Sequence, residues 1–183
     1  MSSSLLRVLA IGSAVPFLVI GAPVRADQGA IPVLRMMTNI TEVEVVNAQK
    51  LWCGSLLNIG ASYRKAGFAA AKSTAELAIN RLYAYQYGAV AFKPTLAYGD
   101  QTFRPTRQGA LAYFIGGDPA FPADKGFALK PCKSCTVRNQ VIQLHGIFAN
   151  TMGNVDFVDA SGGVTTVDKT WAFMREPDGA VRI

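Results

Sequence analysis

Apolar residues recur at steps of three and four in the stretch that follows residue 40. The run begins with Thr41-Glu42-Val43-Glu44, the sequence of a capping box, in which the Thr hydroxyl and the second Glu carboxylate each bind an unpaired amide at a helix start. The apolar positions that follow are Val45, Ala48, Trp52, Leu56 and Ile59. This spacing predicts a helix with one buried face that ends near Gly60 or slightly beyond it.

Two more helices are predicted in the first half of the chain. One starts around Ser73-Thr74 and stops at Gly88. The other is short and runs from Thr106, as its N-cap, to Ile115. The segment between them, 90–92, is strand-like and is closed by a proline.

From residue 136 onward the pattern changes to strand-like alternation. The predicted strands cover 136–149, 155–159 and 164–175, with turns at 150–154 and 161–163. The sequence Glu176-Pro177-Asp178-Gly179 is a strong hairpin turn, because proline sets the first φ and glycine accepts a positive φ. The strand after this turn is much shorter than its partner, so we expect the last strand to be truncated.

Helices followed by a meander of long antiparallel strands indicate an α+β domain whose sheet curls around one helix. This order is that of the cystatin-like cone shared by nuclear transport factor, the SnoaL-like cyclases and the kinase association domain. We therefore expect helices packed on a curved, mostly antiparallel sheet. In such cones the polar groups that line the enclosed pocket define the function, so the fold indicates only where to look.

The first 26 residues have the features of a secretory signal peptide. Arg7 is the lone charge of the n-region, an apolar stretch covers 8–24, and Val24-Arg25-Ala26 places small residues at the recognition positions. A membrane-spanning helix is the alternative, but the stretch is short and is interrupted by Gly and Pro. We expect a signal peptide at 1–26, a linker at 27–40 and one α+β domain at 41–183, in a periplasmic or secreted protein with no stable membrane anchor.

Composition and charge narrow the classes of partner. Half of the 183 residues are hydrophobic and 16% are charged, which excludes a highly charged disordered chain. The net charge of +6 falls to +4 when the two arginines of residues 1–26 are removed. Basic residues do not cluster, since Arg64-Lys65 is their only adjacent pair. We therefore expect no nucleic-acid partner.

The cysteines leave several possibilities open. In an exported protein the Cys132-Lys-Ser-Cys135 sequence favours a local disulfide. A thioredoxin-type redox pair would need a helix to start at the first Cys, whereas a strand-like run follows this one. Zinc bound by Cys132, Cys135 and His145 is a further alternative, although this spacing is no recognised zinc signature. Two free thiols remain the last option.

Hydroxyl groups beside apolar sequence are the most suggestive candidates for chemistry. The chain has no HExxH, no glycine-rich phosphate loop and no GxSxG. The hydroxyls that stand out are those of Tyr83, Tyr85, Tyr87, Thr95 and Tyr113. A buried Tyr or Thr more often makes one structural hydrogen bond than it takes part in catalysis, so these residues permit a polar pocket without demanding one.

Four ordered motifs resemble those of the iota-class carbonic anhydrases. They are Leu82–Gly88 (LYAYQYG), Phe92–Ala97 (FKPTLA), Phe103–Phe114 (FRPTRQGALAYF) and Val167–Trp171 (VDKTW). The resemblance covers roughly residues 41–183. The family pattern continues with His-His-Ser-Ser on the final strand, beyond Ile183, so we expect this chain to be a fragment of a longer protein.

The resemblance implies hydration of carbon dioxide to bicarbonate in the cone pocket. It implies that Thr95 and Tyr113 are catalytic, with Tyr83, Tyr85 and Trp52 as further substrate-pocket residues, and that the protein is a homodimer. Zinc catalysis needs three protein ligands and an open position, so the scarcity of His and of clustered carboxylates favours a metal-free enzyme. The alternatives are a non-catalytic association domain, and a SnoaL-like isomerase or small-ligand binding protein.

Overall fold

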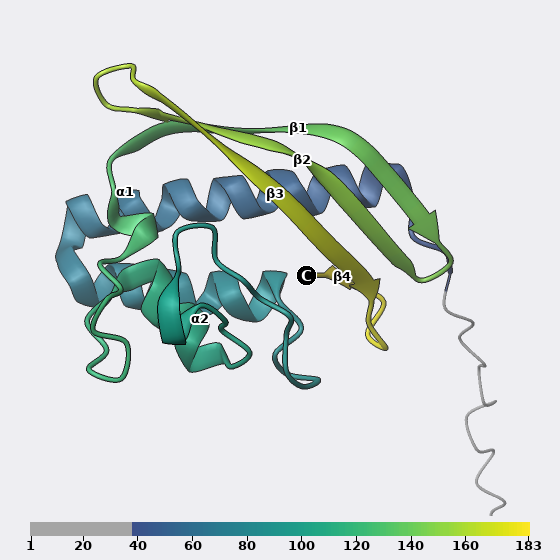
Figure 1. Ribbon diagram of the computed structural model, residues 1–183, viewed down its shortest axis with the longest axis horizontal. Helices are drawn as coiled ribbons and strands as arrows, with labels where there is room; N and C mark the ends of the chain where they lie inside the picture. Colours follow the sequence, from purple (N-terminus) through teal and green to yellow (C-terminus); the bar gives the residue numbers. More distant parts are fainter. Residues whose placement is uncertain (1–37) are drawn as a thin grey trace, which may run out of the picture. The chain divides into compact units, whose positions relative to one another are not determined.

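A long helix packed against a four-stranded antiparallel sheet makes up the described part of the chain (Figure 1). The computed structural model describes residues 38–183, so the predicted signal peptide and residues 27–37 of the predicted linker lie outside it. The helices are α1 (Glu42–Leu82) and α2 (Arg107–Ile115), with short 3-10 turns at Gly99–Gln101 and Phe127–Leu129. The strands are β1 (Cys132–His145), β2 (Phe148–Asp159), β3 (Val164–Arg175) and β4 (Val181–Arg182). The predicted α+β class is confirmed.

Helix α1 consists of two arms that meet at Gly67. The capping box at its start is confirmed, because the Glu44 amide donates to Thr41 Oγ1 (3.3 Å) and the Thr41 amide donates to Glu44 Oε2 (3.0 Å). Gly67 has φ +77°, a conformation that favours glycine, and the second arm returns alongside the first (Figure 1). The Thr74 hydroxyl on the second arm donates to Ser62 Oγ on the first (2.9 Å).

The predicted limits of these two helices were wrong. The first arm continues past Gly60, and a Cβ at that glycine would lie 3.0 Å from the Ala128 carbonyl oxygen. Gly60 therefore serves a close approach of two backbones rather than a helix end. The second arm ends at Leu82 rather than Gly88, so Tyr85 and Tyr87 lie in the turn that follows and not on the helix. Helix α2 begins after Thr106 and ends at Ile115, as predicted.

The four strands pair in sequence order, β1-β2-β3-β4. The turn predicted at residues 150–154 was wrong, because this polar stretch lies inside β2 and the chain turns at Gly146 (φ +61°). Two features explain how polar residues fit inside the strand. Thr151 is buried and accepts a hydrogen bond from Gln49 of α1 (3.1 Å), while a Cβ at Gly153 would clash with the Arg138 carbonyl oxygen.

The last hairpin is confirmed, but the strand-like segment 90–92 is not. The Gly179 amide donates to the Glu176 carbonyl (2.8 Å) and Gly179 has φ +84°. Strand β4 pairs with β3 only at Met174↔Arg182 and Arg175↔Val181. Segment 90–92 has no strand assignment, although its backbone bonds to residues 104–105, as in the 2.8 Å bond from the Arg104 amide to the Phe92 carbonyl.

A disulfide joins Cys53 of α1 to Cys135 of β1, with their Cα atoms 5.3 Å apart. The predicted pairing of Cys132 with Cys135 was therefore wrong, and Cys132 is a free thiol. The reason is geometric: positions three apart on an extended strand are about 10 Å apart, beyond the Cα separation that a disulfide spans. The correct partner lies on the helix that packs against the inner face of β1, which local spacing does not reveal.

The alternative zinc site is also excluded by this strand. Cys132 and His145 are the first and last residues of β1, and strand geometry separates them by roughly 40 Å. Cys135 is held in the disulfide. Within residues 38–183 no group of three or more His, Cys, Asp or Glu side chains is placed to hold a metal ion.

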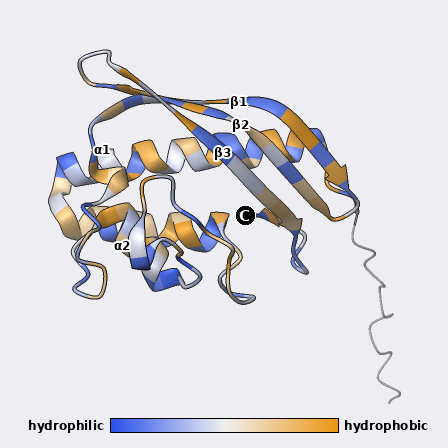
Figure 2. Ribbon diagram, viewed as in Figure 1, coloured by the Kyte–Doolittle hydropathy of each residue, from blue (hydrophilic) through white to orange (hydrophobic). Residues whose placement is uncertain are grey.

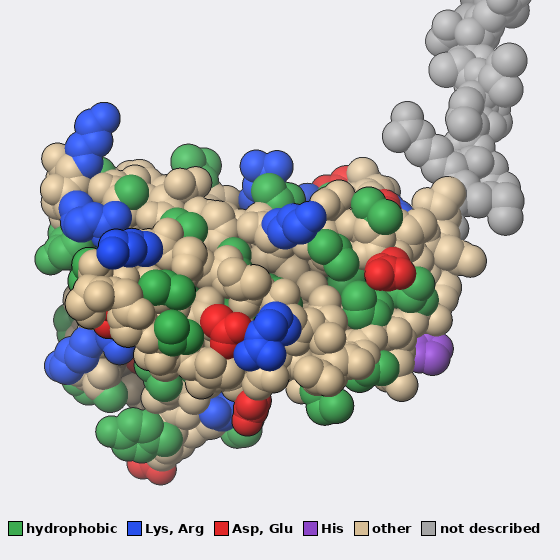
Figure 3. Space-filling model, turned by 90° about the horizontal axis from the view of Figure 1, so that it is seen from above, with side chains coloured by type: hydrophobic (Ala, Val, Ile, Leu, Met, Phe, Trp, Pro, Cys, Tyr) green, Lys and Arg blue, Asp and Glu red, His purple; other side chains and the backbone are tan. Residues whose placement is uncertain are grey.

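The core lies between α1 and the inner face of the sheet, where hydrophobic residues of both elements meet (Figure 2). Its most buried members include Val45, Ile59, Ile79, Val155 and Phe173. On the face seen in Figure 3, basic side chains are interspersed with acidic and apolar ones. Among the described helices, none combines the length and the hydrophobicity needed to cross a membrane.

Candidate active site

A small cavity lies where α1, α2, the 92–95 segment, β2 and β3 meet. Its walls are mostly aromatic, and its free volume is about 10 Å³, which is room for about one water-sized molecule. The lining residues are Trp52, Phe92, Thr95, Tyr113, Phe114, Phe127, Phe157, Val167 and Lys169. Two hydroxyls and one amine therefore face an otherwise largely apolar space.

Thr95 is held by a short loop with backbone hydrogen bonds at both ends. The Phe92 carbonyl accepts from the Arg104 amide (2.8 Å), and the Pro94 carbonyl accepts from the Ala97 amide (3.3 Å). Pro94 is buried and restricts φ, which fixes the backbone just before the threonine. Thr95 Oγ1 accepts a hydrogen bond from Lys169 Nζ at 3.3 Å.

Tyr113 reaches the cavity from α2. The helix start is fixed by Thr106, whose hydroxyl accepts from the Gly109 amide (3.1 Å), and the Tyr113 ring stacks on Phe127 at 5.3 Å between centroids. The Tyr113 hydroxyl accepts from the Leu96 amide at 3.5 Å. Burial raises the pKa of Tyr113 to about 12, so this hydroxyl keeps its proton at neutral pH.

Both hydroxyls, Thr95 Oγ1 and Tyr113 Oη, act as hydrogen-bond acceptors toward the protein. A hydroxyl has one proton to donate and can accept two bonds. Thr95 Oγ1 and Tyr113 Oη each accept one bond from the protein, and within residues 38–183 neither donates its own proton. Two donors in the cavity are therefore free to bind an oxygen atom of a substrate.

Lys169 is a functional candidate that the sequence reasoning missed. It lies on β3, where inward positions alternate from Val167 through Lys169 to Trp171. Its Nζ lies over the rings of Trp52 (5.2 Å), Trp171 (5.7 Å) and Phe92 (6.0 Å). Burial, with a smaller contribution from the charge of Lys93, lowers the pKa of Lys169 to about 8. The alternation along β3 is the signal that could have identified this inward lysine.

Of the three further residues predicted for the substrate pocket, Trp52, Tyr83 and Tyr85, only Trp52 lines the cavity. Trp52 lines the cavity, and its indole N–H donates to the Tyr83 hydroxyl (2.9 Å). The Tyr85 hydroxyl donates to the Arg104 carbonyl (2.8 Å). Burial raises the pKa of both tyrosines. Neither Tyr83 nor Tyr85 is part of the cavity wall, so their role in the substrate pocket stays a prediction.

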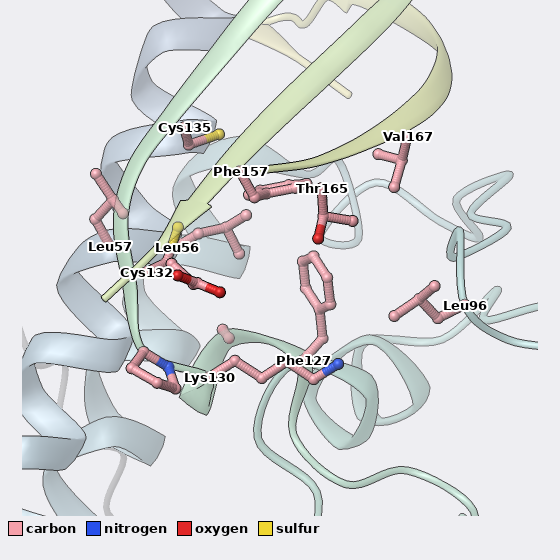
Figure 4. Close-up of a pocket in the computed structure, with 13 residues that line it drawn as sticks. Leu56, Leu57, Leu96, Phe127, Lys130, Cys132, Cys135, Phe157, Thr165 and Val167 are labelled. Carbon is pink, nitrogen blue, oxygen red and sulfur yellow. The ribbon is translucent and has the colours of Figure 1, made fainter. Parts of the chain in front are cut away.

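A larger pocket of about 150 Å³ adjoins the cavity (Figure 4). The two share Phe127, Phe157 and Val167 as wall residues. The remaining lining is mostly apolar and includes Leu96 and the disulfide residue Cys135, with Lys130, Asp159 and Thr165 among its few polar members. The small cavity, with its two hydroxyls and one amine, therefore has a mostly apolar pocket immediately beside it.

The cavity is lined by aromatic rings and hydroxyl donors, and no His, Cys, Asp or Glu side chain of the described residues lines it. It is therefore a small-molecule site without metal ligands. Comparison with known proteins identifies the family. Residues 43–183 match the family of metal-independent carbonic anhydrases, and the chain belongs to this family.

Two relatives illustrate the similarity. A protein of Nostoc sp. (strain PCC 7120 / SAG 25.82 / UTEX 2576), described as a metal-independent carbonic anhydrase, is 51% identical over 144 residues, which are 79% of this chain and 70% of that protein. The crystal structure of an iota-carbonic anhydrase from a cyanobacterium, complexed with bicarbonate, matches with a TM-score of 0.79 and 48% identity. The structural match covers 83% of this chain and 93% of the chain in that crystal structure. The resemblance to iota-class enzymes is confirmed.

Proposed function

We propose that this protein catalyses the reversible hydration of carbon dioxide to bicarbonate where the cavity that contains Thr95 and Tyr113 opens into the adjoining pocket of about 150 Å³, which provides room for the reactants. The activity makes it a lyase, a carbonic anhydrase. The observation that supports the site is the pair of free hydroxyl donors in an aromatic enclosure, in a chain that belongs to the metal-independent family. Carbon dioxide is small and apolar, which suits these walls.

The two hydroxyls act on the charge that develops during the reaction. When water adds to carbon dioxide, negative charge accumulates on the carboxylate oxygens. Thr95 and Tyr113 donate to these oxygens, and they are held in place by the bonds that they accept from Lys169 and from the Leu96 amide. Donors that are fixed before the reaction stabilise the transition state without reorganising.

The lining residues do not fit a catalytic zinc ion. Zinc is held by imidazole, thiolate or carboxylate ligands, three of them in a catalytic site. The cavity wall provides hydroxyls and an amine instead. The water that attacks carbon dioxide must therefore lose its proton to a side chain or to a buffer base.

The adjoining pocket of Figure 4 provides the route by which carbon dioxide reaches the cavity. Its mostly apolar wall suits an uncharged gas molecule, and it meets the cavity at Phe127, Phe157 and Val167. We also propose that the long helix and the four-stranded antiparallel sheet form the cystatin-like cone. We further propose that residues 1–26 are a signal peptide and that the protein is periplasmic or secreted. We also propose that it forms a homodimer. The disulfide between Cys53 and Cys135 supports export, because disulfides persist in oxidising compartments.

Replacing each hydroxyl in the full-length protein tests the proposed site. We expect Thr95→Val and Tyr113→Phe each to lower kcat for hydration by about 10²–10³, the usual cost of losing one such donor. Tyr98→Phe is the matched control, because Tyr98 is 86% exposed. Stopped-flow measurement of carbon dioxide hydration gives the rates, and thermal unfolding verifies the fold. Near-normal rates in both variants would overturn this site.

A further inference from the structure

We propose that Lys169 accepts the proton of the attacking water and then, as an ammonium ion, holds the bicarbonate product. The inference rests on the proposed function and adds to it the group that the reaction still requires.

The position of the amine supports direct contact with the reacting atoms. Lys169 Nζ lies 3.3 Å from Thr95 Oγ1, one of the two hydroxyls that would bind a substrate oxygen. Lys169 and Tyr113 line the same small cavity, so a molecule inside it lies close to all three groups. Water bound beside Thr95 is therefore within reach of the amine.

The surroundings of the amine allow it to lose its proton. No described carboxylate forms a salt bridge with Lys169, since those of the described residues join Arg104, Arg138, Arg175 and Arg182 to their partners. Burial among aromatic rings removes most of the solvent from around the amine, and the charge of Lys93 on the neighbouring loop opposes a second cation. Tyr113, which faces the cavity from α2, stays neutral because burial raises its pKa to about 12.

These surroundings lower the pKa of Lys169 to about 8, whereas an ordinary lysine titrates near 10.5. A general base is most effective when its pKa lies near the working pH. Of the three polar groups in the cavity, Lys169 is the one that exchanges a proton near neutral pH. The rings of Trp52, Trp171 and Phe92 then stabilise the ammonium form through cation–π contacts.

The step can be written with atoms and charges in balance. The water oxygen forms a bond to the carbon of carbon dioxide, and one C=O π pair moves to an oxygen held by Thr95 and Tyr113. One O–H bond of the water breaks, and the proton passes to the lone pair of Lys169 Nζ. The products are bicarbonate and an ammonium ion, which attract each other in the cavity. Release of bicarbonate and transfer of the proton to a buffer base in solution restore the amine.

Two substitutions in the full-length protein separate proton transfer from anion binding. Lys169→Met removes both functions, whereas Lys169→Arg keeps a cation that does not deprotonate near neutral pH. We expect hydration to fall by about 10²-fold or more in both variants. Bicarbonate binding, measured by calorimetry, is expected to be lost in Lys169→Met and kept in Lys169→Arg. Lys133→Met, on the exposed side of β1, is the control.

The pH profile provides a readout that a purely structural lysine would not change. Because the neutral amine is the active form, we expect kcat/KM for hydration to rise with pH, with an apparent pKa near 8, and this rise to be absent in both variants. A near-normal hydration rate in Lys169→Met, or full hydration activity in Lys169→Arg, would overturn the proton-acceptor role. A full-length protein that shows no hydration at all would instead contradict the proposed function.

Discussion

Arg104 and Lys169 are both cationic side chains placed against aromatic rings, but their surroundings differ. Arg104 is 2% exposed, lies over the Phe121 ring at 4.9 Å, and donates to both carboxylate oxygens of Asp124 at 3.1 and 3.2 Å. Lys169 lies over Trp52 at 5.2 Å, and a neutral hydroxyl is its acceptor. The charge of Arg104 is neutralised by Asp124, so this side chain has a structural role. Lys169 has no such counter-charge among the described residues, so its amine can interact with a molecule bound in the cavity.

The tyrosine hydroxyls show the same contrast. The Tyr85 hydroxyl donates its proton to the Arg104 carbonyl, so its hydrogen bond serves the fold. The Tyr113 hydroxyl accepts from the Leu96 amide and keeps its proton available. For Tyr85 and Tyr113, the difference lies in whether the hydroxyl proton is already used by the protein. The Tyr83 hydroxyl also accepts one bond, from Trp52, and donates none within residues 38–183, but it is not part of the cavity wall, so an unused proton marks a site residue only where it faces the cavity.

The largest expected effect comes from Arg104→Met. Removing one partner of a buried ion pair leaves Asp124 uncompensated, which costs about 3–5 kcal/mol of unfolding free energy. Lys169→Met leaves no buried carboxylate behind, so we expect it to cause no comparable loss. Urea unfolding of both variants and of the wild type measures the difference.

A double variant provides the control for this comparison. Replacing Asp124 together with Arg104 by apolar residues removes the uncompensated charge, and we expect it to recover part of the lost stability. Equal destabilisation by Arg104→Met and Lys169→Met would refute the distinction between a structural and a functional cation.

The next effect concerns the pH dependence of stability. The pKa of Lys169 is about 8 in the folded protein and near 10.5 for an ordinary lysine, so between these values the unfolded chain holds a proton that the folded chain has released. Stability therefore rises with pH in this window because of Lys169. At most one proton is involved, which limits the rise of the unfolding free energy to about 1.4 kcal/mol per pH unit.

Lys169→Met is expected to abolish this contribution. Urea unfolding at several pH values from 7.5 to 10.5, for the wild type and the variant, isolates it by difference. The same slope in both proteins would show that Lys169 is not depressed in pKa, and it would remove one support of the proton-acceptor role.

Features that depend on neighbouring residues could be predicted from the sequence. The capping box at Thr41, the cap of α2 at Thr106 and the turn at Gly179 follow from short-range hydrogen bonds, and the structure contains all three. The limits of α1 could not be predicted in this way. Gly60 and Gly67 look alike in sequence, but only the contact with Ala128 shows that the first serves packing.

The candidate site depended more heavily on contacts distant in sequence. Thr95 and Tyr113 were selected by resemblance, and the structure brings both to one cavity. The disulfide partner of Cys135 lies 82 residues away, so the local Cys132 was the wrong choice. Lys169 was missed because a lysine is ordinarily assigned to the surface, whereas alternation along β3 places it inward.

The smallest expected effect compares Tyr85→Phe with Tyr113→Phe. Tyr85→Phe removes one hydrogen bond to the Arg104 carbonyl and is expected to cost about 1 kcal/mol of unfolding free energy, with a much smaller loss of hydration rate than Tyr113→Phe. Tyr113→Phe is expected to show the opposite pattern, with a large loss of hydration rate and a small loss of unfolding free energy, because its proton serves the substrate rather than the fold. Unfolding and stopped-flow rates measured on both variants provide the comparison. If Tyr85→Phe slowed hydration as much as Tyr113→Phe, Tyr85 would belong to the substrate pocket, and an unused proton would no longer distinguish functional from structural hydroxyls.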